Sequence, residues 1–421
     1  MGSRCAPKPS HGLGRLSRIG TGLTALLLLA GCDAPPPAAL TQEAYVWQRT
    51  WTAPVGAAVR SRELDLDGLR VLGLHWVGDH AVATRLDLSA LAARALPLRL
   101  VIRIEGSRPR IPSATVATAV REVLTEWQSQ GLPVQGIEVD HDCGSGGLAD
   151  YAAWLASLKA ELPANLSLSI TALPSWLDNP DALRALRGIA DESVLQVHAV
   201  DARQAHLFNA DNALNWVAAW QANAHSPFRV ALPAYRLRVR SAANGKALVV
   251  AAEGPGELAG DAARERYAIP AEVARVVREL NQMRPSMLRG WLWFRLPVEG
   301  DRLGWTPTTL AYAMRGEMPM ARIELLAVAR GNGLFDLFLH NADQLDGLGP
   351  SAIAFPAHCG VLEGSGAFVT DPSTRRLQAE QAPWLSPDQR LAIGFTRCAQ
   401  PLPAQQVLHA SPTGSAAATT P

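Results

Sequence analysis

The chain has 421 residues, of which 48% are hydrophobic and 18% are charged, so it can bury one large core and a smaller one. This composition excludes a disordered protein and a disulfide-rich miniprotein. With 39 basic and 38 acidic residues the formal net charge is +1, which offers no positive field for nucleic acid. The 34 glycines and 30 prolines predict many short turns and argue against a coiled coil or a helical bundle.

The N-terminus has the pattern of a secretion signal. Basic residues without any acidic residue precede a short apolar run at residues 19–30, and the Leu-Ala-Gly-Cys sequence that ends at Cys32 resembles a bacterial lipobox. We therefore expect a lipoprotein signal peptide at residues 1–31 and a Pro/Ala spacer at residues 32–43, with an ordinary cleaved signal as the alternative. A lipidated Cys32, acylated for example with palmitate, would hold the protein on a membrane of the cell envelope, facing the periplasm. Whether this is the inner or the outer membrane stays open.

Export also predicts how the remaining cysteines behave. In an oxidising compartment Cys359 and Cys398, which share the C-terminal segment, are the expected disulfide. Cys143 is then expected to be a buried thiol. No Cys/His spacing suggests zinc, and we expect neither a metal nor a cofactor.

Apolar runs of strand character alternate with segments of helical spacing in the first two thirds of the mature chain. The expected strands are 44–48, 69–76, 98–105, 134–140, 166–173, 194–200, 229–235 and 290–296. The expected helices are 114–130, 148–162, 180–189, 212–222 and 271–283. Such alternation requires parallel pairing with right-handed crossovers, and eight units of this size predict a (β/α)8 TIM-type barrel at residues 44–318. A doubly wound open sheet is the alternative, but no glycine-rich turn follows the first strand.

After the barrel the sequence changes to short β-strands. Residues 322–328 and 335–341 flank a Gly-Asn-Gly turn and predict a hairpin, and further short runs lie at 352–356, 367–370 and 390–395. We expect a β-sandwich-like module at residues 319–400 and a disordered tail at residues 401–421. The expected fold class is therefore α/β, a TIM-type barrel followed by a β-sandwich-like module.

The fourth expected strand carries the most specific pattern. Period-two alternation places Glu138, Asp140 and Asp142 on one face, at the strand end where the active sites of such barrels lie. Carboxylates held this close raise the pKa of at least one member, which suits a proton donor. The alternative is a set of solvated acids at a strand end. We expect these three residues to be catalytic.

The same run resembles the fourth-strand signature Asp-Gly-x-Asp-x-Asp-x-Glu of glycoside hydrolase family 18 chitinases. Gly136 matches the glycine, Glu138 and Asp140 match the inner aspartates, and Asp142 stands where the catalytic glutamate would be. The run departs from the signature in three places: Gln135 replaces the first aspartate, Glu138 replaces the second, and Asp142 is one methylene shorter than the expected donor. The resemblance implies that Asp142 protonates the glycosidic oxygen and that Asp140 stabilises the acetamido group of the substrate as nucleophile.

A longer pattern runs through the barrel. It comprises Tyr45-Val46-Trp47-Gln48-Arg49, the strand from Glu138 to Cys143, Asp150-Tyr151, the run from Leu168 to Pro174, and Leu195-Gln196-Val197-His198. Together these segments resemble the bacterial domain-of-unknown-function family numbered 3142. The resemblance implies a barrel, often exported, and no established activity.

Further polar and aromatic residues fall near the ends of the expected strands. We expect a substrate-binding surface made of Trp47, His75, Arg103, Glu105, Thr171, Trp176, Gln196, His198, Tyr235 and Trp293. Arg103 and Glu105 share a face, where they could pair with each other or orient a ligand. Tryptophans on or just after strands could stack on sugar rings; these are Trp47, Trp76, Trp176, Trp291 and Trp293. Core packing is expected for Trp127, Trp154, Trp216 and Trp220 on helical faces.

These observations predict an envelope-anchored glycoside hydrolase-like protein that acts on an exported or cell-wall polysaccharide or oligosaccharide by carboxylate acid/base catalysis. A second hypothesis is a non-catalytic carbohydrate-binding lipoprotein with a degenerate hydrolase site. A third makes the acids of the fourth strand and a histidine such as His198 a hard-metal site for ester or phosphodiester hydrolysis.

Overall fold

The computed structural model describes residues 39–106, 109, 111–198, 207–224, 226–241, 247–251, 263–408 and 415–417. The expected signal peptide at residues 1–31 and Cys32 lie outside the described residues, as does the first part of the expected spacer. The first strand already begins at Thr41, inside the segment that the sequence assigned to the spacer. None of the helices in these ranges is both long and apolar enough to span a bilayer.

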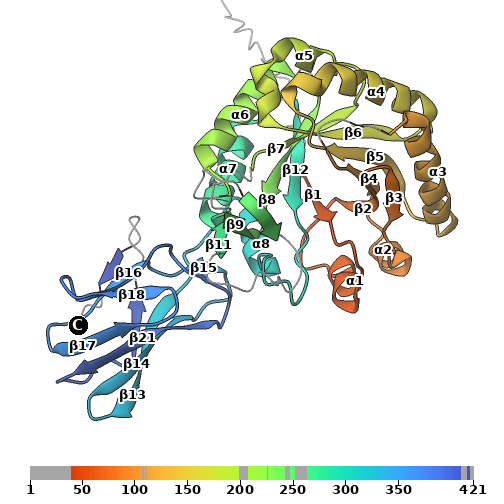
Figure 1. Ribbon diagram of the computed structural model, residues 1–421. Coiled ribbons are helices and arrows are strands. Elements are labelled where there is room, and N and C mark those ends of the chain that lie inside the picture. The colour runs from red at the N-terminus through yellow and green to blue at the C-terminus, as the bar shows by residue number, and fades with distance from the viewer. Residues whose placement is uncertain are drawn as a thin grey trace, which may run out of the picture. The chain divides into compact units, whose positions relative to one another are not determined.

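Eight parallel strands close into a barrel (Figure 1). The strands are β1 (Thr41–Val46), β2 (Gly68–Val77), β4 (Leu98–Ile104), β5 (Val134–His141), β6 (Ser167–Ala172), β7 (Glu192–Gln196), β8 (Phe228–Pro233) and β12 (Leu288–Phe294). They pair in the order β1-β12-β8-β7-β6-β5-β4-β2, and β1 pairs with β2 to complete the ring. Each expected barrel strand is present, so the predicted (β/α)8 fold is confirmed.

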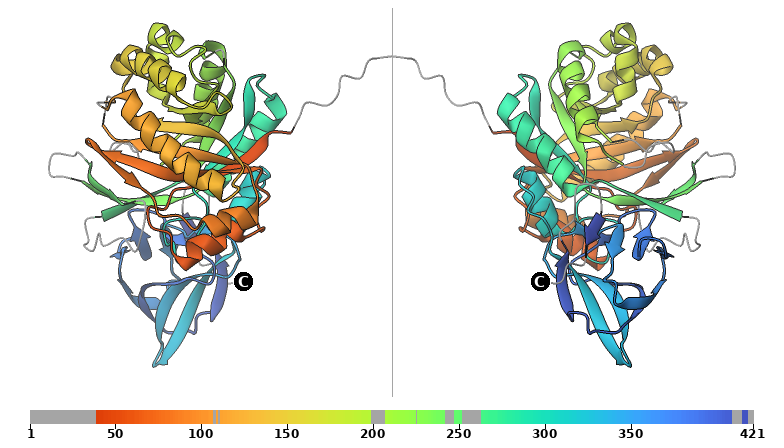
Figure 2. Two further views of the ribbon diagram at one scale, coloured as in Figure 1. Left: turned by 90° about the vertical axis from the view of Figure 1, so that its right-hand side faces the viewer. Right: turned by 90° about the vertical axis from the view of Figure 1, so that its left-hand side faces the viewer.

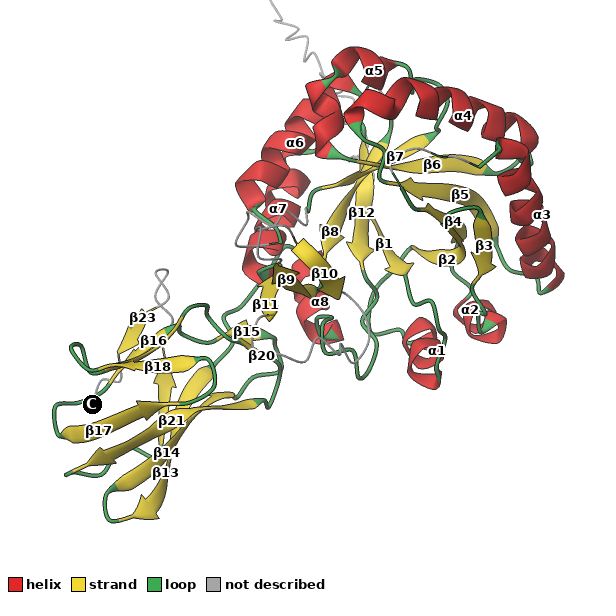
Figure 3. Ribbon diagram, in the orientation of Figure 1, coloured by secondary structure: helices red, strands yellow, loops and turns green. Residues whose placement is uncertain are grey.

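Helices cover the outside of the barrel, as Figure 3 and the side views of Figure 2 show. They are α1 (Ala53–Arg60), α2 (Leu88–Arg94), α3 (Ser113–Ser129), α4 (Leu148–Glu161), α5 (Pro180–Arg184), α6 (Ala210–Asn223), α7 (Pro270–Met283) and α8 (Pro307–Met314), with 3-10 turns η1 (Ser145–Gly147) and η2 (Pro174–Asp178). Their buried residues recur at helical spacing; on α3, for example, they are Val116, Val120, Leu124 and Trp127. The helix expected at 180–189 ends earlier, at Arg184.

Two β-elements of the barrel domain were not expected from the sequence. Strand β3 (His80–Ala83) turns back on β2 as an antiparallel hairpin. Strands β9 (Arg236–Ser241), β10 (Ala247–Ala251) and β11 (Ala263–Tyr267) form a separate antiparallel sheet between β8 and α7. Strand β3 has four residues, and β9, β10 and β11 have five or six, so each offers too few positions for a clear strand signal in the sequence.

The C-terminal module forms further β-sheets with a core of its own. A five-stranded sheet has the order β17 (Cys359–Gly364), β21 (Arg390–Cys398), β14 (Leu334–Asn341), β13 (Ile323–Gly331) and β22 (Gln405–Leu408). A four-stranded sheet contains β18 (Phe368–Asp371), β19 (Arg376–Ala379), β16 (Ala352–Ala354) and β23 (Ser415–Ala417), and β15 (Gly347–Leu348) pairs with β20 (Trp384–Leu385). Residues of both larger sheets share one apolar cluster, as expected for a β-sandwich-like module.

The predicted tail starts too early. Residues 405–408 form β22, which pairs antiparallel with β13, and Leu408 is buried in the module core. The polar and proline-rich composition of residues 401–421 suggested disorder, so this short edge strand was not recognised from the sequence. Residues 409–414 and 418–421 lie outside the described part of the chain.

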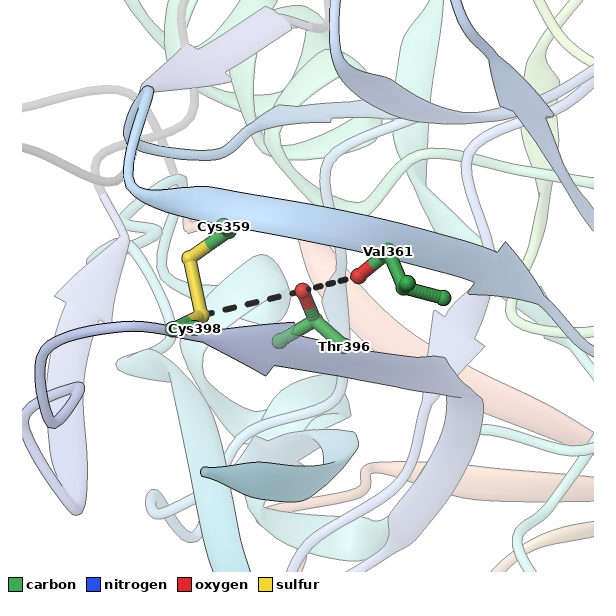
Figure 4. Close-up of a disulfide and its surroundings, with 4 residues drawn as sticks. All are labelled: Cys359, Val361, Thr396 and Cys398. Carbon is green, nitrogen blue, oxygen red and sulfur yellow. Dashed lines mark hydrogen bonds between the residues drawn. A yellow bond between two sulfur atoms is a disulfide. The ribbon is translucent and has the colours of Figure 1, made fainter. Parts of the chain in front are cut away.

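The expected disulfide joins Cys359 and Cys398, which face each other across β17 and β21 (Figure 4). Thr396 Oγ1 beside it donates a hydrogen bond to the Val361 carbonyl oxygen at 2.6 Å. Cys143 is buried and not part of a disulfide, as the sequence predicts. The bridge therefore ties two neighbouring strands of the five-stranded sheet.

The barrel interior contains a charged layer where aliphatic side chains are usual. Arg70 is fully buried and forms ion pairs with Glu43 at 2.7 Å, with Glu192 at 2.6 Å, and with Glu138. Arg229 also contacts Glu43 and Glu192, each at 3.0 Å. The desolvation cost of these charges is offset by their mutual attraction and by complete hydrogen bonding.

Two glycines leave room for the arginines of this layer. A Cβ atom on Gly136 would lie 2.3 Å from an Arg99 guanidinium nitrogen, and one on Gly290 would lie 2.6 Å from an Arg229 guanidinium nitrogen. An apolar cluster of Tyr45, Leu72, Val101, Val194, Ala231 and Leu292 continues the interior toward the carboxyl ends of the strands. The floor of any site at that end is therefore apolar and rests on a neutralised charged layer.

We predict that Arg70→Met lowers the free energy of unfolding by about 3 to 5 kcal/mol, because it leaves buried carboxylates without their shared cation. The exposed pair of Arg60 with Asp87 provides the control, since Arg60→Met should cost at most about 1 kcal/mol. Chemical denaturation of both variants measures the difference. Equal losses would contradict a stabilising role for the interior cation.

Candidate functional site

A cavity of about 710 Å³ opens at the carboxyl ends of the barrel strands, where active sites of this fold lie. Its described lining residues are Tyr45, Trp47, Arg49, Arg103, Glu105, Asp140, Asp142, Leu173, Pro174, Ser175, Asp178, Gln196, His198, Trp216, Ala231, Tyr235 and Phe294. Most of the lining side chains thus lie at or just after the carboxyl ends of β1, β4, β5, β6, β7, β8 and β12, and they meet at one opening. Of the residues expected at the site, Asp140, Asp142, Trp47, Arg103, Glu105, Gln196, His198 and Tyr235 lie on this wall.

An arginine bridges the two acids of the fourth strand. Arg103 lies opposite Asp140 in the parallel pairing of β4 with β5, and its Nη1 donates to Asp140 Oδ2 at 2.9 Å. Its Nη2 donates to Asp142 Oδ2 at 2.6 Å. Asp140 is only 3% exposed, whereas the side chain of Asp142 is 47% exposed and faces solvent. The acids are therefore one buried and one open carboxylate joined by a cation.

Burial raises the pKa of Asp140 to about 6; Arg103 opposes this shift and the nearby Asp142 adds to it. Burial lowers the pKa of Arg103, but its two carboxylate partners outweigh it and hold the pKa above the ordinary value. Asp140 Oδ1 is buried, and the Thr171 hydroxyl, which lowers the pKa of Asp140, is the one side-chain donor beside it among the residues that the structure describes. A proton on Asp140 or a donor from a ligand would satisfy this oxygen.

Glu138 does not belong to the cavity, which corrects the expectation that it is catalytic. It is fully buried, accepts hydrogen bonds from the Tyr45 hydroxyl and from Arg70, and accepts a third from Ser169 Oγ at 3.2 Å. Period-two alternation placed it correctly on the interior face. Its depth along the barrel axis, level with Val101 of β4, removes it from the opening.

Arg103 and Glu105 do not pair with each other. Glu105 instead lies 2.8 Å from His75 Nε2 and 3.9 Å from Arg49. His75 is 6% exposed and does not line the cavity, so the expectation that it contacts substrate is corrected. It contacts Glu105, which does line the cavity. Burial lowers the pKa of His75, and the hydrogen bond to Glu105 only partly opposes this shift.

Thr171 likewise lies behind the wall. It is 2% exposed, and its Oγ1 accepts a hydrogen bond from the His141 backbone N–H at 3.2 Å. Because β6 neighbours β5, this bond fixes the end of the strand that carries Asp140 and Asp142. Thr171 is therefore placed to position the acids, and the expectation that it binds substrate directly is corrected.

Aromatic rings form one side of the cavity. Trp47 and Phe294 meet at 5.2 Å between ring centroids, and Phe294 meets Tyr235 at the same separation, in both cases edge to face. Burial raises the pKa of Tyr235 and lowers that of His198 to about 4, so His198 is a neutral imidazole. This aromatic side of the cavity combines ring surfaces with few charges, which suits the apolar face of a sugar.

Four other strand tryptophans are core residues. Trp176 and Trp293 are fully buried, and their indole nitrogens donate to the Cys143 carbonyl oxygen at 2.6 Å and to Gln42 Oε1 at 2.7 Å. The expectation that these two bind substrate is wrong, since alternation along β12 points Trp293 outward and η2 turns Trp176 inward. Trp76 and Trp291 are buried as well.

Trp216 is the reverse case. The sequence assigned it to the core, but it is half-buried on α6 and lines the cavity. Tyr45, Arg49, Asp178 and Phe294 also line the cavity and were not expected there. Tyr45 and Phe294 lie near strand ends, and this position could have indicated that they line the cavity. No sequence signal shows that α6, which carries Trp216, reaches the opening.

The acids do not form a metal site in the described part of the chain. The one group of close His, Cys and carboxylate side chains found there is His358, Cys359 and Cys398, and its two sulfurs form the disulfide. Glu138 is engaged by Arg70, and Asp140 and Asp142 are engaged by Arg103. A cation would have to displace these arginines, so the hard-metal hypothesis loses its support.

Family models cover both domains of the chain. Residues 94–299 match the model of a domain of unknown function, DUF3142, and residues 324–399 match that of a second, DUF8456. The first match confirms the family resemblance expected from the barrel segments. A search of the curated proteins finds no match to this chain.

The structure is similar to solved chitinase-like barrels. The spore cortex-lytic enzyme SleL of Bacillus megaterium aligns with a TM-score of 0.50 and 13% identity, over 68% of this chain and 76% of that chain. Chitinase ChiA74 of Bacillus thuringiensis aligns with a TM-score of 0.43 and 9% identity, over 88% of this chain and 100% of that chain. Human YKL-39, a pseudo-chitinase with retained chitooligosaccharide binding properties, aligns with a TM-score of 0.42 and 11% identity, over 61% and 92%. At these identities the likeness concerns the fold.

The raised pKa of Asp140 predicts a pH-dependent contribution to stability. A carboxyl whose pKa is about 6 in the folded state, against an ordinary value of 3.8, stabilises the fold below pH 3.8, and this contribution is lost as the pH rises through 6. Between pH 4 and pH 7 the stability of the wild type relative to Asp140→Asn should therefore fall by up to about 3 kcal/mol.

Thermal or chemical unfolding across this pH range measures the effect. Asp181→Asn, on an exposed acid of α5 that pairs with Arg184, serves as the control and should follow the wild-type curve. A constant offset between the wild type and Asp140→Asn would show that Asp140 does not bind a proton in this range.

Proposed function

We propose that this chain, whose barrel carries a DUF3142 domain, is a glycoside hydrolase-like protein that binds a polysaccharide or oligosaccharide in the cavity and cleaves it with Asp140 and Asp142. The observation that carries the proposal is the coupled acid pair at the mouth of an aromatic-walled cavity, with the pKa of Asp140 raised to about 6. Two carboxyl groups that differ in burial beside a sugar-sized cavity are the usual requirement for hydrolysis of a glycosidic bond.

In the proposed reaction the protonated member of the pair gives its proton to the glycosidic oxygen as the bond between that oxygen and the anomeric carbon breaks. The ionised member stabilises the positive charge that develops on the ring. Water then adds its oxygen to the anomeric carbon, and its proton restores the acid. Because the carboxyls interact through Arg103, we assign the titration to the pair rather than to one residue.

A second candidate is a carbohydrate-binding protein without hydrolytic activity, and the Arg103 bridge favours it. An arginine that contacts both carboxylates stabilises their ionised forms and so works against proton donation. Asp142 is also shorter than the glutamate at the corresponding position of the chitinase signature, so its proton has less reach. Hydrolysis then requires the sugar to displace at least one of the Arg103 contacts.

We also propose that the protein acts at the cell envelope. The basic and apolar segment at residues 1–31 and the lipobox-like sequence at Cys32 support export and lipidation. The disulfide between Cys359 and Cys398 fits an oxidising compartment. An exported or cell-wall polysaccharide is the substrate class that such a location offers.

Purified protein should release reducing ends from amino-sugar or neutral glycans, and Asp142→Asn should lower kcat/KM by about 100- to 10,000-fold, since a positioned acid contributes this much. Asp140→Asn should lower it similarly, and the wild-type rate should decline as the pH rises above 6. Asp181→Asn on the exposed surface should retain the wild-type rate.

Calorimetry on the same glycans separates the two candidates. Binding without product, with the affinity unchanged in Asp142→Asn, would replace the hydrolase by the binding protein. Neither binding nor product with any glycan would contradict both.

Cys32→Ala should abolish incorporation of labelled palmitate and release the protein from the membrane fraction, because a lipidated cysteine is the expected anchor. The buried Cys143→Ala variant is the control and should keep the label. Unchanged labelling of Cys32→Ala would contradict lipidation at this residue.

A further inference from the structure

The cavity wall carries more acidic than basic side chains. Its described residues include the acids Glu105, Asp140, Asp142 and Asp178, and the bases Arg49 and Arg103. His198 adds no charge, because burial lowers its pKa to about 4. With every acid ionised the described wall has a net charge of −2, and one proton on the acid pair brings it to −1.

The two arginines leave little positive charge for a ligand. Arg103 uses both terminal nitrogens on Asp140 and Asp142. Arg49 is 56% exposed and lies 3.9 Å from Glu105. Asp178, exposed at the end of η2, has no ion-pair partner among the residues described. Among the described residues that line the cavity, Asp178 is thus a carboxylate without an ion-pair partner, whereas Arg49 and Arg103 each have a carboxylate partner.

A second, independent observation points to a ligand that donates hydrogen bonds. Asp140 lines the cavity at 3% exposure, and apart from the nearby Thr171 hydroxyl, which lowers the pKa of Asp140, its Oδ1 has no donor in the described part of the chain. On the same wall the Nδ1 atom of His198 is also buried without a partner among these residues. In a neutral imidazole that bonds a backbone group through its other nitrogen, Nδ1 is an acceptor. Both atoms require a donor.

We infer that the cavity takes a glycan whose amino sugars carry free, unacetylated amines, so that an ammonium group meets the acidic wall at Asp178. This inference rests on the proposed function, whose substrate class it narrows. An ammonium supplies three hydrogen-bond donors and a positive charge, which matches a wall with excess carboxylate and unsatisfied acceptors. A uronic acid or another acidic sugar would meet like charge and is disfavoured.

Such a substrate changes what the protein must supply. An acetamido group can attack the anomeric carbon through its carbonyl oxygen, but an ammonium has no such oxygen and no free electron pair. Stabilisation of the developing charge therefore falls to the carboxylate of the pair that does not donate the proton. This division of roles requires both Asp140 and Asp142, rather than a single acid.

The test uses calorimetry with the purified protein at low ionic strength. The probes are oligomers of glucosamine, of N-acetylglucosamine and of glucuronic acid, matched in length and tested in each available linkage. We expect the glucosamine oligomer to bind about ten-fold more tightly than its acetylated counterpart, and the glucuronic acid oligomer not to bind. Added salt should reduce the preference, because it screens the attraction.

Asp178→Asn should reduce several-fold the ratio of the affinity for the free-amine oligomer to the affinity for the acetylated oligomer. Asp181→Asn removes the same charge outside the cavity and should keep the preference. Equal or tighter binding of the acetylated oligomer, or an unchanged preference in Asp178→Asn, would overturn the inference and leave the proposed function standing. Absence of binding by every probe would overturn the inference, and absence of binding by neutral glycans as well would overturn the proposed function.

Discussion

The ion cluster around Arg70 determines which acids of the fourth strand are available for chemistry. This fully buried guanidinium is held by Glu43 of β1, Glu138 of β5 and Glu192 of β7, so one cation links strands around the ring. Removing any one partner would change the charge balance of this buried cluster by one unit, which is costly where water cannot reach. Glu138 is therefore committed to the interior, and the functional surface of β5 begins at Asp140, two residues farther along.

The pairing register of the barrel strands also determines which side chains line the cavity. Glu138 of the charged cluster lies level with Val101 of the apolar cluster, and the next inward residues of β4 and β5 are Arg103 and Asp140, which are opposite each other in the parallel pairing. Strand pairing alone thus places a cation against a buried carboxylate at the mouth of the barrel. Asp142, which follows the end of β5, meets the second nitrogen of the same guanidinium. The site geometry is a continuation of the barrel register.

Local patterning was sufficient for the barrel strands and the acid-bearing strand, because alternation of strand and helix and a period of two are properties of short segments. It assigned Glu138 to the interior face but not its depth along the barrel axis, which depends on how the strands are staggered around the ring. Trp216 was missed because only the packing of α6 brings it to the cavity. The edge strand β22 was missed because it has only four residues, two of them glutamines, and its pairing with the distant β13 is not visible in the local sequence.

The placement of charge limits where a cationic sugar can put its ammonium group. An ammonium next to Asp140 and Asp142 would stabilise their ionised forms, as Arg103 already does, and would remove the proton that the reaction needs. An ammonium next to Asp178, which has no described ion-pair partner, gains attraction without this loss. The unit whose bond is cleaved is therefore best placed with its amine away from the pair, while a neighbouring unit pairs with Asp178. Binding strength and acid strength are then set by different carboxylates, so that each can change without the other.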